Sequence, residues 1–514
     1  MNWKIKRDPY YSALYKRFGE DKIVEAGFIY DSDTVDRDVK ASTNILCTPL
    51  HKVSANLAKW PQHPNFIGKG PCVLLSCGSF APIHEGHTLI LGQARAEVEK
   101  NGYTCIGGYI SPSHDEYIKA KTGADWIPIH YRNRAIQDLI KTSDWLSLDP
   151  WEGTFNKVAI NFTDVVMRLE AYLKKHLGAD IPVFFVCGGD NAKFALTFIE
   201  IGRCIVVNRP GYEDRYEKYK SIIQSGLIDS PKVNERIFWS PGGNALSSTG
   251  VRKDKKFQAD EKKSLILRVE EYSDLEPSII SKMKEEFASV NQKKLSEQKK
   301  QFEEISPLSN FISLDSLKNT GHTLEVSRLY DLFGINLIDY INRPGTPPLS
   351  EQVDKIAPDK DYYLFDDDIH SGGTMRYAKS ILKHKLNIKG VFSFSISSAD
   401  EGEILDCRDF ILNDNKNSGL VVELPNGKHI RAPYLYPYVD IFQRGSIDSP
   451  MQFSLEMWKI NAGYFKKYQF EHMVEPRLKD YPNWLELFTY IGFKPEDKMF
   501  QICQWHIDLL TNFV

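Results

Sequence analysis

Between residues 71 and 240 the sequence alternates short apolar runs with longer segments whose apolar residues recur at helical spacing. A short apolar run bounded by glycine is typical of a buried strand, and a stripe at every third or fourth residue is typical of a helix packed on a sheet. Their alternation predicts a parallel sheet with right-handed helical crossovers. The predicted strands are 73–77, 103–111, 182–187, 204–207 and 236–239, and the clearest predicted helices are 85–100 and 157–177.

Changes in composition divide the 514-residue chain into five parts. Residues 253–305 are rich in Lys and Glu and contain no glycine, which predicts helices with mostly polar faces. From about residue 320 the alternation of apolar runs and helical segments returns, which predicts a second α/β domain. The predicted parts are an N-terminal extension (1–70), a first α/β domain (71–260), a charged helical connector (261–307), a second α/β domain (308–450) and a helical C-terminal region (451–514).

The charge balance and the apolar content exclude several classes of protein. Lys plus Arg is 65 and Asp plus Glu is 68, so the formal net charge is −3, and this offers no basic field for nucleic acid or a membrane surface. No apolar run approaches the roughly 20 residues of a spanning helix, and the first residues lack the apolar core of a signal peptide. The eight cysteines form no C-x-x-C pair, as is typical of free thiols in a reducing compartment. We therefore expect a cytoplasmic protein without nucleic-acid or membrane partners.

A ten-residue motif lies between the first predicted strand and the helix that follows it: Gly78-Ser79-Phe80-Ala81-Pro82-Ile83-His84-Glu85-Gly86-His87. A glycine at the end of a strand lets the backbone approach a ligand closely, and the free N–H groups of a helix N-terminus favour an anion. His84 and His87 are three residues apart on the first turn, so their imidazoles face the same side. Together these features predict a polyphosphate site with two histidine donors.

A second predicted helix start follows the strand 236–239 and reads Ser247-Ser248-Thr249-Gly250-Val251-Arg252. Serine and threonine favour helix N-termini because their hydroxyls satisfy free N–H groups. Arg252 lies one turn further on, where a guanidinium can clamp phosphate oxygens. In isolation this segment would equally suit an ordinary capped helix with a surface arginine, but beside the first motif a shared phosphate site is the favoured interpretation.

The patterns G-x-F-x-P-x-H-x-G-H and S-S-T-x-x-R together resemble the signature motifs of the nicotinamide/nicotinate mononucleotide adenylyltransferases, which belong to the HxGH nucleotidyltransferase superfamily. The resemblance covers about residues 71–260 and is greatest to the eukaryotic branch. Further segments similar to that branch are 111–121, 127–132, 149–152, 187–190 and 208–211, although the spacing between Tyr117 and Tyr131 differs. The resemblance implies a Rossmann-like nucleotidyltransferase domain that transfers an adenylyl group from ATP to the mononucleotide, with Mg²⁺ held by the substrate phosphates.

The same resemblance implies a role for individual residues. The catalytic residues would be His84, His87 and Arg252. ATP would be bound by Gly78, Phe80, His84, His87, Gly188, Asp190, Ser248, Thr249 and Arg252. The mononucleotide would be bound by Ser79, Lys119, Lys121 and Trp151, with one lysine on the phosphate and the tryptophan stacked on the pyridine ring.

A second motif ends the predicted strand 362–365 and reads Asp366-Asp367-Asp368-Ile369-His370-Ser371-Gly372-Gly373-Thr374. The N–H groups of a glycine-rich turn before a helix form a cup for a monophosphate, and nearby carboxylates can bind ribose hydroxyls directly or through Mg²⁺. Over 361–380 the sequence resembles the ribose-5-phosphate motif of type I phosphoribosyltransferases. The resemblance implies that phosphoribosyl diphosphate is bound by Asp366, Asp367, Ser371, Gly372, Gly373 and Thr374, with Asp366 and Asp367 also available to Mg²⁺.

Three functions follow from these motifs. The leading hypothesis is a bifunctional enzyme of pyridine-nucleotide biosynthesis, in which the second, phosphoribosyltransferase-like domain forms a nucleotide from a base. The second is an adenylyltransferase whose second domain only senses a nucleotide. The candidate pyrophosphate loop 343–346 leaves no room for the flexible loop usual in phosphoribosyltransferases, which supports this second hypothesis, whereas the intact acidic and glycine-rich positions count against it. The third is an adenylyltransferase that acts on a protein or another acceptor. The choice between nicotinamide and nicotinate stays open, as does a homo-oligomer.

Overall fold

The computed structural model of the chain forms two compact units, Met1–Gln258 and Ala259–Val514, and each is described by itself. In the described part of the chain, no helix combines the length and the apolar character needed to cross a membrane. The described residues are 42–60, 68–199, 202–225, 232–242, 257–270, 274–305, 310–314, 322–333, 336–358, 360–369, 371–396, 403–413, 418–442 and 447–513.

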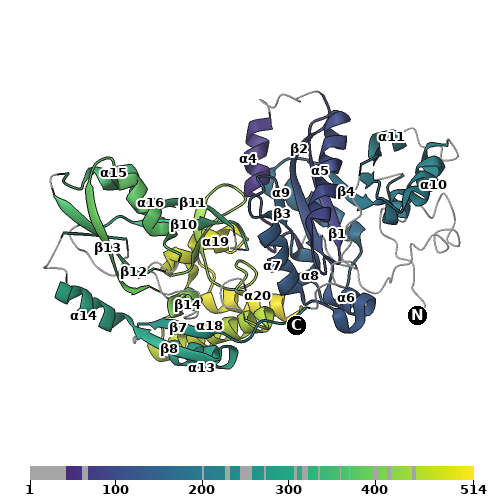
Figure 1. The fold of residues 1–514 in the computed structure, drawn as a ribbon. Helices are drawn as coiled ribbons and strands as arrows, with labels where there is room; N and C mark the ends of the chain where they lie inside the picture. Colours follow the sequence, from purple (N-terminus) through teal and green to yellow (C-terminus); the bar gives the residue numbers. More distant parts are fainter. Residues whose placement is uncertain are drawn as a thin grey trace. The chain divides into compact units, whose positions relative to one another are not determined.

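The first unit is built on a six-stranded parallel sheet with the strand order β3-β2-β1-β4-β5-β6 (Figure 1). This is the doubly wound arrangement that the alternation of strands and helices predicts, and the five predicted strands are confirmed. The short strand β3 was missed because three residues are too few to show a period. The strands are β1 (Pro71–Gly78), β2 (Thr104–Pro112), β3 (Leu146–Leu148), β4 (Val183–Gly188), β5 (Cys204–Val207) and β6 (Ile237–Ser240).

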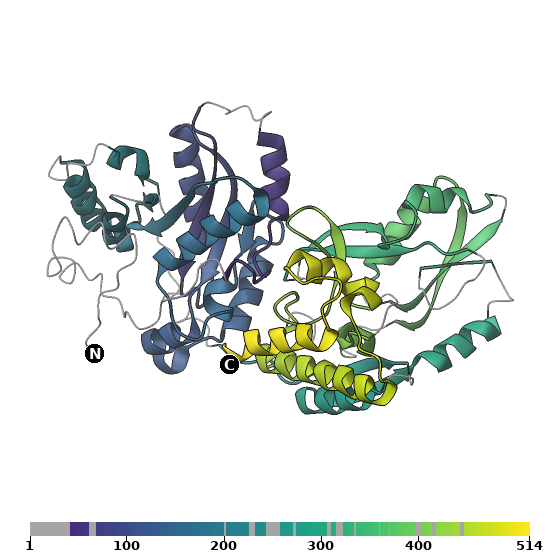
Figure 2. The ribbon, with the colours of Figure 1, turned by 180° about the vertical axis from the view of Figure 1, so that it is seen from behind.

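Helices pack on both faces of this sheet (Figures 1 and 2). On one face, α5 (Glu85–Lys100) and α7 (Ile129–Ile140) bury Leu91, Ala94 and Ile136 against the strands. On the other face are α4 (His51–Lys59) and α9 (Phe162–Leu177), whose Phe162 stacks on Phe185. The remaining helical segments are α6 (Asp115–Thr122), η3 (Gly123–Asp125), α8 (Trp151–Thr154), η4 (Gly189–Phe198), α10 (Glu213–Gln224) and α11 (Val233–Arg236).

The described part of the N-terminal extension, residues 42–60, belongs to the core of the first unit. Tyr109 of β2 donates a hydrogen bond to the carbonyl oxygen of Pro49, at a distance of 2.7 Å. Thr48 donates to the carboxylate of Asp149, also at 2.7 Å, and both side chains are fully buried. Buried hydrogen bonds of this kind hold a segment in place. Breaking one would leave a buried polar group with neither a protein nor a water partner, which costs free energy. Residues 42–60 therefore contribute to the stability of the sheet.

The second unit contains three sheets. The four-stranded sheet has the order β11-β10-β15-β16 and mixes parallel and antiparallel pairs, whereas the two three-stranded sheets, β13-β12-β9 and β14-β7-β8, are parallel. The strands are β7 (Ser264–Val269), β8 (Ser289–Lys294), β9 (Phe311–Ser313), β10 (Val326–Tyr330), β11 (Leu337–Asn342), β12 (Asp361–Ile369), β13 (Asn387–Ile396), β14 (Glu403–Asp406), β15 (Leu420–Glu423) and β16 (His429–Ala432).

The helices of the second unit include a C-terminal group in which α18 packs against α20. His506 of α20 is fully buried and stacks on Trp458 of α18, with ring centroids 3.8 Å apart. The helical segments are α13 (Glu276–Glu286), α14 (Leu295–Ile305), α15 (Leu349–Asp354), α16 (Gly373–Leu382), η7 (Cys407–Phe410), α18 (Pro450–His472), η8 (Leu478–Asp480), α19 (Pro482–Tyr490) and α20 (Met499–Thr511).

Residues 261–307 are not the purely helical connector that their composition predicts. They contain the helices α13 and α14, but also the strands β7 and β8, which pair in parallel with each other, and β7 also pairs in parallel with β14. In β7 the residues Leu265, Leu267 and Val269 are buried, whereas the residues between them are partly exposed. This period of two identifies a strand with one face in the core. The strand was not predicted, because its six residues lie among many lysines and glutamates and the composition of the whole segment indicates polar helices.

Candidate active site

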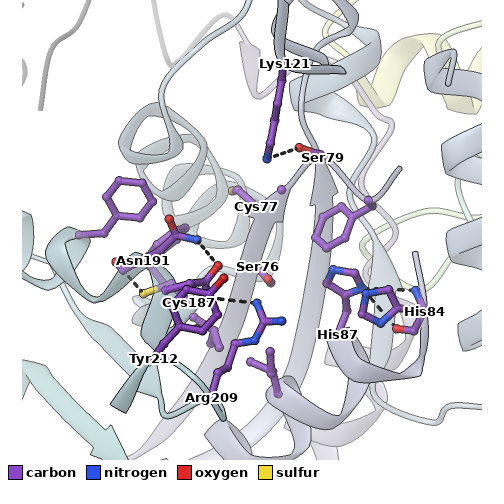
Figure 3. A pocket seen from close by; sticks show the side chains of 18 residues that line it. Ser76, Cys77, Ser79, His84, His87, Lys121, Cys187, Asn191, Arg209 and Tyr212 are labelled. Carbon is purple, nitrogen blue, oxygen red and sulfur yellow. Dashed lines mark hydrogen bonds and ion pairs between the residues drawn. The ribbon is translucent and has the colours of Figure 1, made fainter. Parts of the chain in front are cut away.

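A cavity of about 510 Å³ opens where β1 and β4 end (Figure 3). These strands are neighbours in the centre of the sheet, and the strand order reverses direction between them. Ligands of doubly wound sheets bind at such a switch point, because the loops that leave the two strands diverge there. The lining residues are Ser76, Cys77, Gly78, Ser79, Phe80, His84, His87, Ile90, Lys121, Phe185, Val186, Cys187, Gly188, Asp190, Asn191, Phe194, Arg209 and Tyr212.

The loop between β1 and α5 forms one wall of the cavity. Phe80 has a φ of +42°, in the left-handed region that residues other than glycine rarely adopt. Its ring lies close to Gly78, where an added Cβ would be only 3.2 Å from the Phe80 Cζ. The ring also packs edge-on against His87, with centroids 4.9 Å apart. Backbone strain of this kind is concentrated at ligand-binding sites, which makes the loop a candidate ligand-binding segment.

The two histidines of the motif form a pair at the N-terminus of α5. The backbone N–H of His84 donates to Nδ1 of His87 at 3.3 Å, and the ring centroids are 4.0 Å apart. Nδ1 of His87 also lies 3.3 Å from the carbonyl oxygen of His84, so the backbone of His84 fixes the orientation of the His87 ring. Burial lowers the pKa of His87 to about 3 and also lowers the pKa of His84. Both rings are therefore neutral near pH 7. The ring nitrogens of His84 have no hydrogen-bond partner in the described part of the chain.

The opposite wall is formed by the end of β4 and the loop after β5. Arg209 pairs with Asp190, with Nη1 and Oδ1 3.2 Å apart, and Asn191 donates to the other carboxylate oxygen at 3.2 Å. The positive charge of Arg209 contributes to the lowered pKa of both His84 and His87. The cavity thus has a cationic group opposite the neutral histidine pair, which suits a polyanionic ligand.

Of the two lysines that the sequence proposes for the mononucleotide phosphate, the structure brings one to the cavity. Lys121 donates from Nζ to the hydroxyl of Ser79 at 2.9 Å (Figure 3). Lys119 is not among the lining residues, and its Nζ lies 4.2 Å from the ring centroid of Trp126. The geometry therefore favours Lys121 as the lysine that meets a ligand.

Comparison with known proteins identifies the fold around this cavity. Residues 75–254 match the cytidylyltransferase-like family. A cytidylyltransferase-like domain spans these residues. Relatives of the first unit include nicotinamide/nicotinic acid mononucleotide adenylyltransferase 2 of Danio rerio, which is 43% identical over 81 residues, 16% of this chain and 25% of the relative. The Caenorhabditis elegans protein of the same name is 30% identical over 117 residues, 23% of this chain and 51% of the relative.

A plant protein extends this set of relatives. The nicotinamide/nicotinic acid mononucleotide adenylyltransferase of Arabidopsis thaliana is 29% identical over 121 residues, which is 23% of this chain and 49% of the relative. The chain thus spans between a quarter and about half of the length of the curated relatives that it matches.

The cytidylyltransferase-like domain brings together most of the predicted site residues. Ser248, Thr249 and Arg252 lie outside the described residues. Asn191, Arg209 and Tyr212 also line the cavity and were not predicted from the sequence. For Arg209 a signal existed, because it lies two residues after the end of β5 and within segment 208–211, one of the similar motifs. The predicted residues that line the cavity are Gly78, Ser79, Phe80, His84, His87, Lys121, Gly188 and Asp190.

Trp151 lies in the domain but does not line the cavity. It is the first residue of α8, and only 4% of its surface is exposed. The guanidinium of Arg168 lies 5.2 Å from its ring centroid, and Trp151 Nε1 has no hydrogen-bond partner among the described residues. The proposed stacking of this tryptophan on a pyridine ring stays a prediction.

Glu152 lies beside Trp151 in a buried position that predicts a pH effect. Ser111 donates to its carboxylate at 2.9 Å, and burial raises the pKa of Glu152 to about 7. The stability contributed by the protonated group is fully present below the unfolded pKa of about 4.5 and is lost as the pH rises to about 7. Glu152→Gln, which resembles the protonated form, should therefore gain stability over the wild type between pH 4.5 and 7.5, by up to about 3 kcal/mol.

Chemical unfolding at several pH values measures this difference. Glu99→Gln is a suitable control, because Glu99 belongs to a different helix, near the C-terminus of α5, and forms an ion pair with Arg95. Parallel stability curves for wild type and Glu152→Gln would contradict the assignment.

In the second unit, the glycine-rich motif connects the end of β12 to α16. Gly372 has a φ of +65° and is the residue before the first turn of α16. A Cβ on Gly373 would lie 2.3 Å from the hydroxyl of Tyr340. Position 373 therefore admits glycine alone without a shift of Tyr340. Asp366 is half-buried near the end of β12, and nothing is described of the Asp367 side chain.

The candidate pyrophosphate loop 343–346 is joined to the same end of β12. Arg343 is 8% exposed and donates from Nη2 to the carbonyl oxygen of Leu314 at 3.2 Å. The N–H of Leu314 donates in turn to the carbonyl oxygen of Phe365 at 2.8 Å. Two hydrogen bonds thus connect the loop to the residue before Asp366, although more than 20 residues separate Arg343 from Asp366 in the chain.

Proposed function

We propose that the first unit transfers an adenylyl group from ATP to nicotinamide mononucleotide or its nicotinate analogue, releasing pyrophosphate. The observation that carries the proposal is the neutral His84–His87 pair at the N-terminus of α5, facing a cavity at the switch point of a doubly wound sheet. The relatives of the domain that bear this activity in their names support it. Helix N-termini favour phosphates, so the triphosphate is assigned to this wall.

The two substrates would occupy opposite ends of the cavity. Asp190 can accept hydrogen bonds from the ribose hydroxyls of adenosine, because β4 ends in Gly188 and leaves its carboxylate at the cavity wall. Lys121 and the Ser79 hydroxyl would hold the phosphate of the mononucleotide. Trp151 is the proposed partner of the pyridine ring, and a protein acceptor would have no use for it.

The proposed chemistry requires mainly placement and charge neutralisation. An oxygen of the mononucleotide phosphate attacks the α-phosphorus of ATP, and the bond to the leaving pyrophosphate breaks without a covalent intermediate on the protein. Nε2 of His87 donates to the phosphate oxygens, and Arg209 and Arg252 add positive charge as the pyrophosphate leaves. Asp190 is the only carboxylate among the lining residues and is paired with Arg209. This fits Mg²⁺ held by the substrate phosphates, where it would neutralise charge.

A direct assay tests the proposal. The protein is incubated with ATP, Mg²⁺ and one of several mononucleotides, including the nicotinamide and nicotinate forms, and pyrophosphate and dinucleotide are measured. We expect both products in equal amounts with at least one pyridine mononucleotide. Pyrophosphate release without dinucleotide, together with adenylylation of an added protein, would instead support a protein acceptor. The absence of both products would refute the proposal.

For the second unit we propose binding of phosphoribosyl diphosphate at the end of β12. The observation that supports this proposal is the connection of the 343–346 loop, through Leu314, to Phe365, the residue before the acidic motif. Asp366, Asp367 and Mg²⁺ would hold the ribose and the diphosphate, and Ser371, Gly372, Gly373 and Thr374 the 5′-phosphate. A catalytic domain would use this site to make a nucleotide from a base, whereas a sensor would only bind.

Calorimetry with phosphoribosyl diphosphate and Mg²⁺ tests this second site. We expect binding to the wild type, and its loss in the double variant Asp366→Asn/Asp367→Asn and in Gly373→Val, which would collide with Tyr340. Gly463→Ala is the control for a glycine change, because Gly463 lies inside α18 and no atom lies within 4 Å of a Cβ at that position. No binding to the wild type, or unchanged binding in both variants, would refute the site. Binding without base-dependent release of pyrophosphate would favour the sensor.

A further inference from the structure

Arg132 is a buried cation that touches the cavity wall from behind. It belongs to α7, and only 1% of its surface is exposed. Its Nη1 donates to the carbonyl oxygen of Ser79 at 3.0 Å, and its Nε donates to the carbonyl oxygen of Ile127 at 2.9 Å. Its Nη2 donates to a carboxylate oxygen of Asp115 at 2.6 Å. One guanidinium thus joins three separate segments of the first unit.

The partners of Arg132 lead to the lysine at the cavity. Asp115 is the first residue of α6, and its other carboxylate oxygen accepts from the backbone N–H of Ile129 at 3.2 Å. Lys121 lies on the same helix and reaches the hydroxyl of Ser79. Arg132 therefore holds both ends of the Lys121–Ser79 contact: the backbone of Ser79 directly, and the helix that carries Lys121 through Asp115.

We propose that Arg132 is a positioning residue that sets Lys121 and Ser79 in register to receive the phosphate of the acceptor nucleotide. This inference rests on the proposed function and adds a residue that itself makes no contact with substrate. Lysine has a long flexible stem, and holding its base and its hydrogen-bond partner in one frame lowers the entropy lost when the phosphate binds. A planar guanidinium is suited to this task because it donates in several fixed directions, which an ammonium cannot do.

The position of Arg132 predicts that its substitution weakens the binding of the mononucleotide but not of ATP. Without it the buried carbonyl groups of Ser79 and Ile127 lose their donor, and Asp115 loses its counter-charge. The Lys121–Ser79 side of the cavity would then loosen. The wall formed by Gly188, Asp190 and Arg209 comes from other elements, and the three hydrogen bonds of Arg132 described above do not reach it.

Arg132→Gln, Lys121→Gln and the double variant test the inference. For Arg132→Gln we expect the KM for the mononucleotide to rise about tenfold, with the KM for ATP changed less than about twofold. If Arg132 acts through Lys121, the two effects are coupled. Arg132→Gln should then raise the KM for the mononucleotide much less in the Lys121→Gln variant than in the wild type. Arg132→Lys keeps the charge and provides a second, milder variant, for which we expect a smaller rise.

The control is Arg95→Gln, which breaks an ion pair of 3.0 Å with Glu99 on α5, away from the cavity-lining residues. We expect both KM values of this variant to equal those of the wild type. Equal rises in both KM values for Arg132→Gln and Arg132→Lys, or additive effects in the double variant, would overturn the positioning role. Calorimetry with nicotinamide mononucleotide and with nicotinate mononucleotide separates the positioning role from the proposed function. If the wild type binds neither mononucleotide, the proposed function is refuted. If the wild type and Arg132→Gln bind the preferred mononucleotide equally, only the positioning role is refuted.

Discussion

His87→Ala is expected to lower kcat for dinucleotide formation by about 100-fold or more, the scale of losing one preorganised donor to a transition state. The backbone N–H of His84 fixes Nδ1 of His87, so that Nε2 can donate to the phosphates. Folding should survive, because His87 lies in the first turn of α5 and alanine favours helices. Steady-state kinetics with ATP and nicotinamide mononucleotide, together with a thermal unfolding curve, measure both expectations.

The pH profile gives an independent check on His87. With a pKa of about 3 the imidazole is neutral throughout the physiological range, so the wild-type rate should show no step between pH 5 and 8 from this group. Thr88→Ala is the matched control, because Thr88 is the next residue of α5 and its hydroxyl donates only to the carbonyl oxygen of Glu85. Near-normal turnover by His87→Ala would exclude His87 as a donor in the transition state.

The site residues that could be predicted from the sequence are those whose positions depend on one short segment of the chain. A strand ending in Gly78, followed by a helix that begins with His84 and His87, fixes the position of all three residues without reference to the rest of the fold. Gly188 and Asp190 follow the same rule at the end of β4. Because parallel strands end at one edge of a sheet, the two segments meet once the sheet is predicted.

The parts that were missed depend on contacts between distant segments. Arg209 gains its position from Asp190, which follows a different strand, and Arg132 gains its position from Ser79 and Asp115. No periodicity in the sequence connects these residues. Trp151 stays a prediction for a related reason: a local motif indicates that it meets the ligand, whereas its burial and its contact with Arg168 depend on other segments. In β7, the alternating burial of six residues shows a strand within a segment whose composition predicts helices.

Gly188→Ala is expected to weaken ATP binding by about 10- to 100-fold, the range set by losing a hydrogen bond to a charged group. A Cβ at this position would lie 2.5 Å from Oδ1 of Asp190 and 2.6 Å from Cδ of Arg209. Both distances are too short for any real contact, so the two side chains must move and their ion pair must change. Because they are side chains at a cavity wall, the sheet itself should stay intact. Calorimetry with a non-hydrolysable ATP analogue measures the affinity.

Gly92→Ala is the matched control for this substitution. Gly92 lies inside α5 of the same unit, and no atom lies within 4 Å of a Cβ at that position. An alanine there should leave ATP binding unchanged and raise the free energy of unfolding by about 0.5–1 kcal/mol, because glycine is unfavourable in a helix interior. If Gly188→Ala bound the analogue as tightly as Gly92→Ala, the wall formed by Asp190 and Arg209 would not contact ATP. The nucleotide would then have to be held by the loop between β1 and α5 alone.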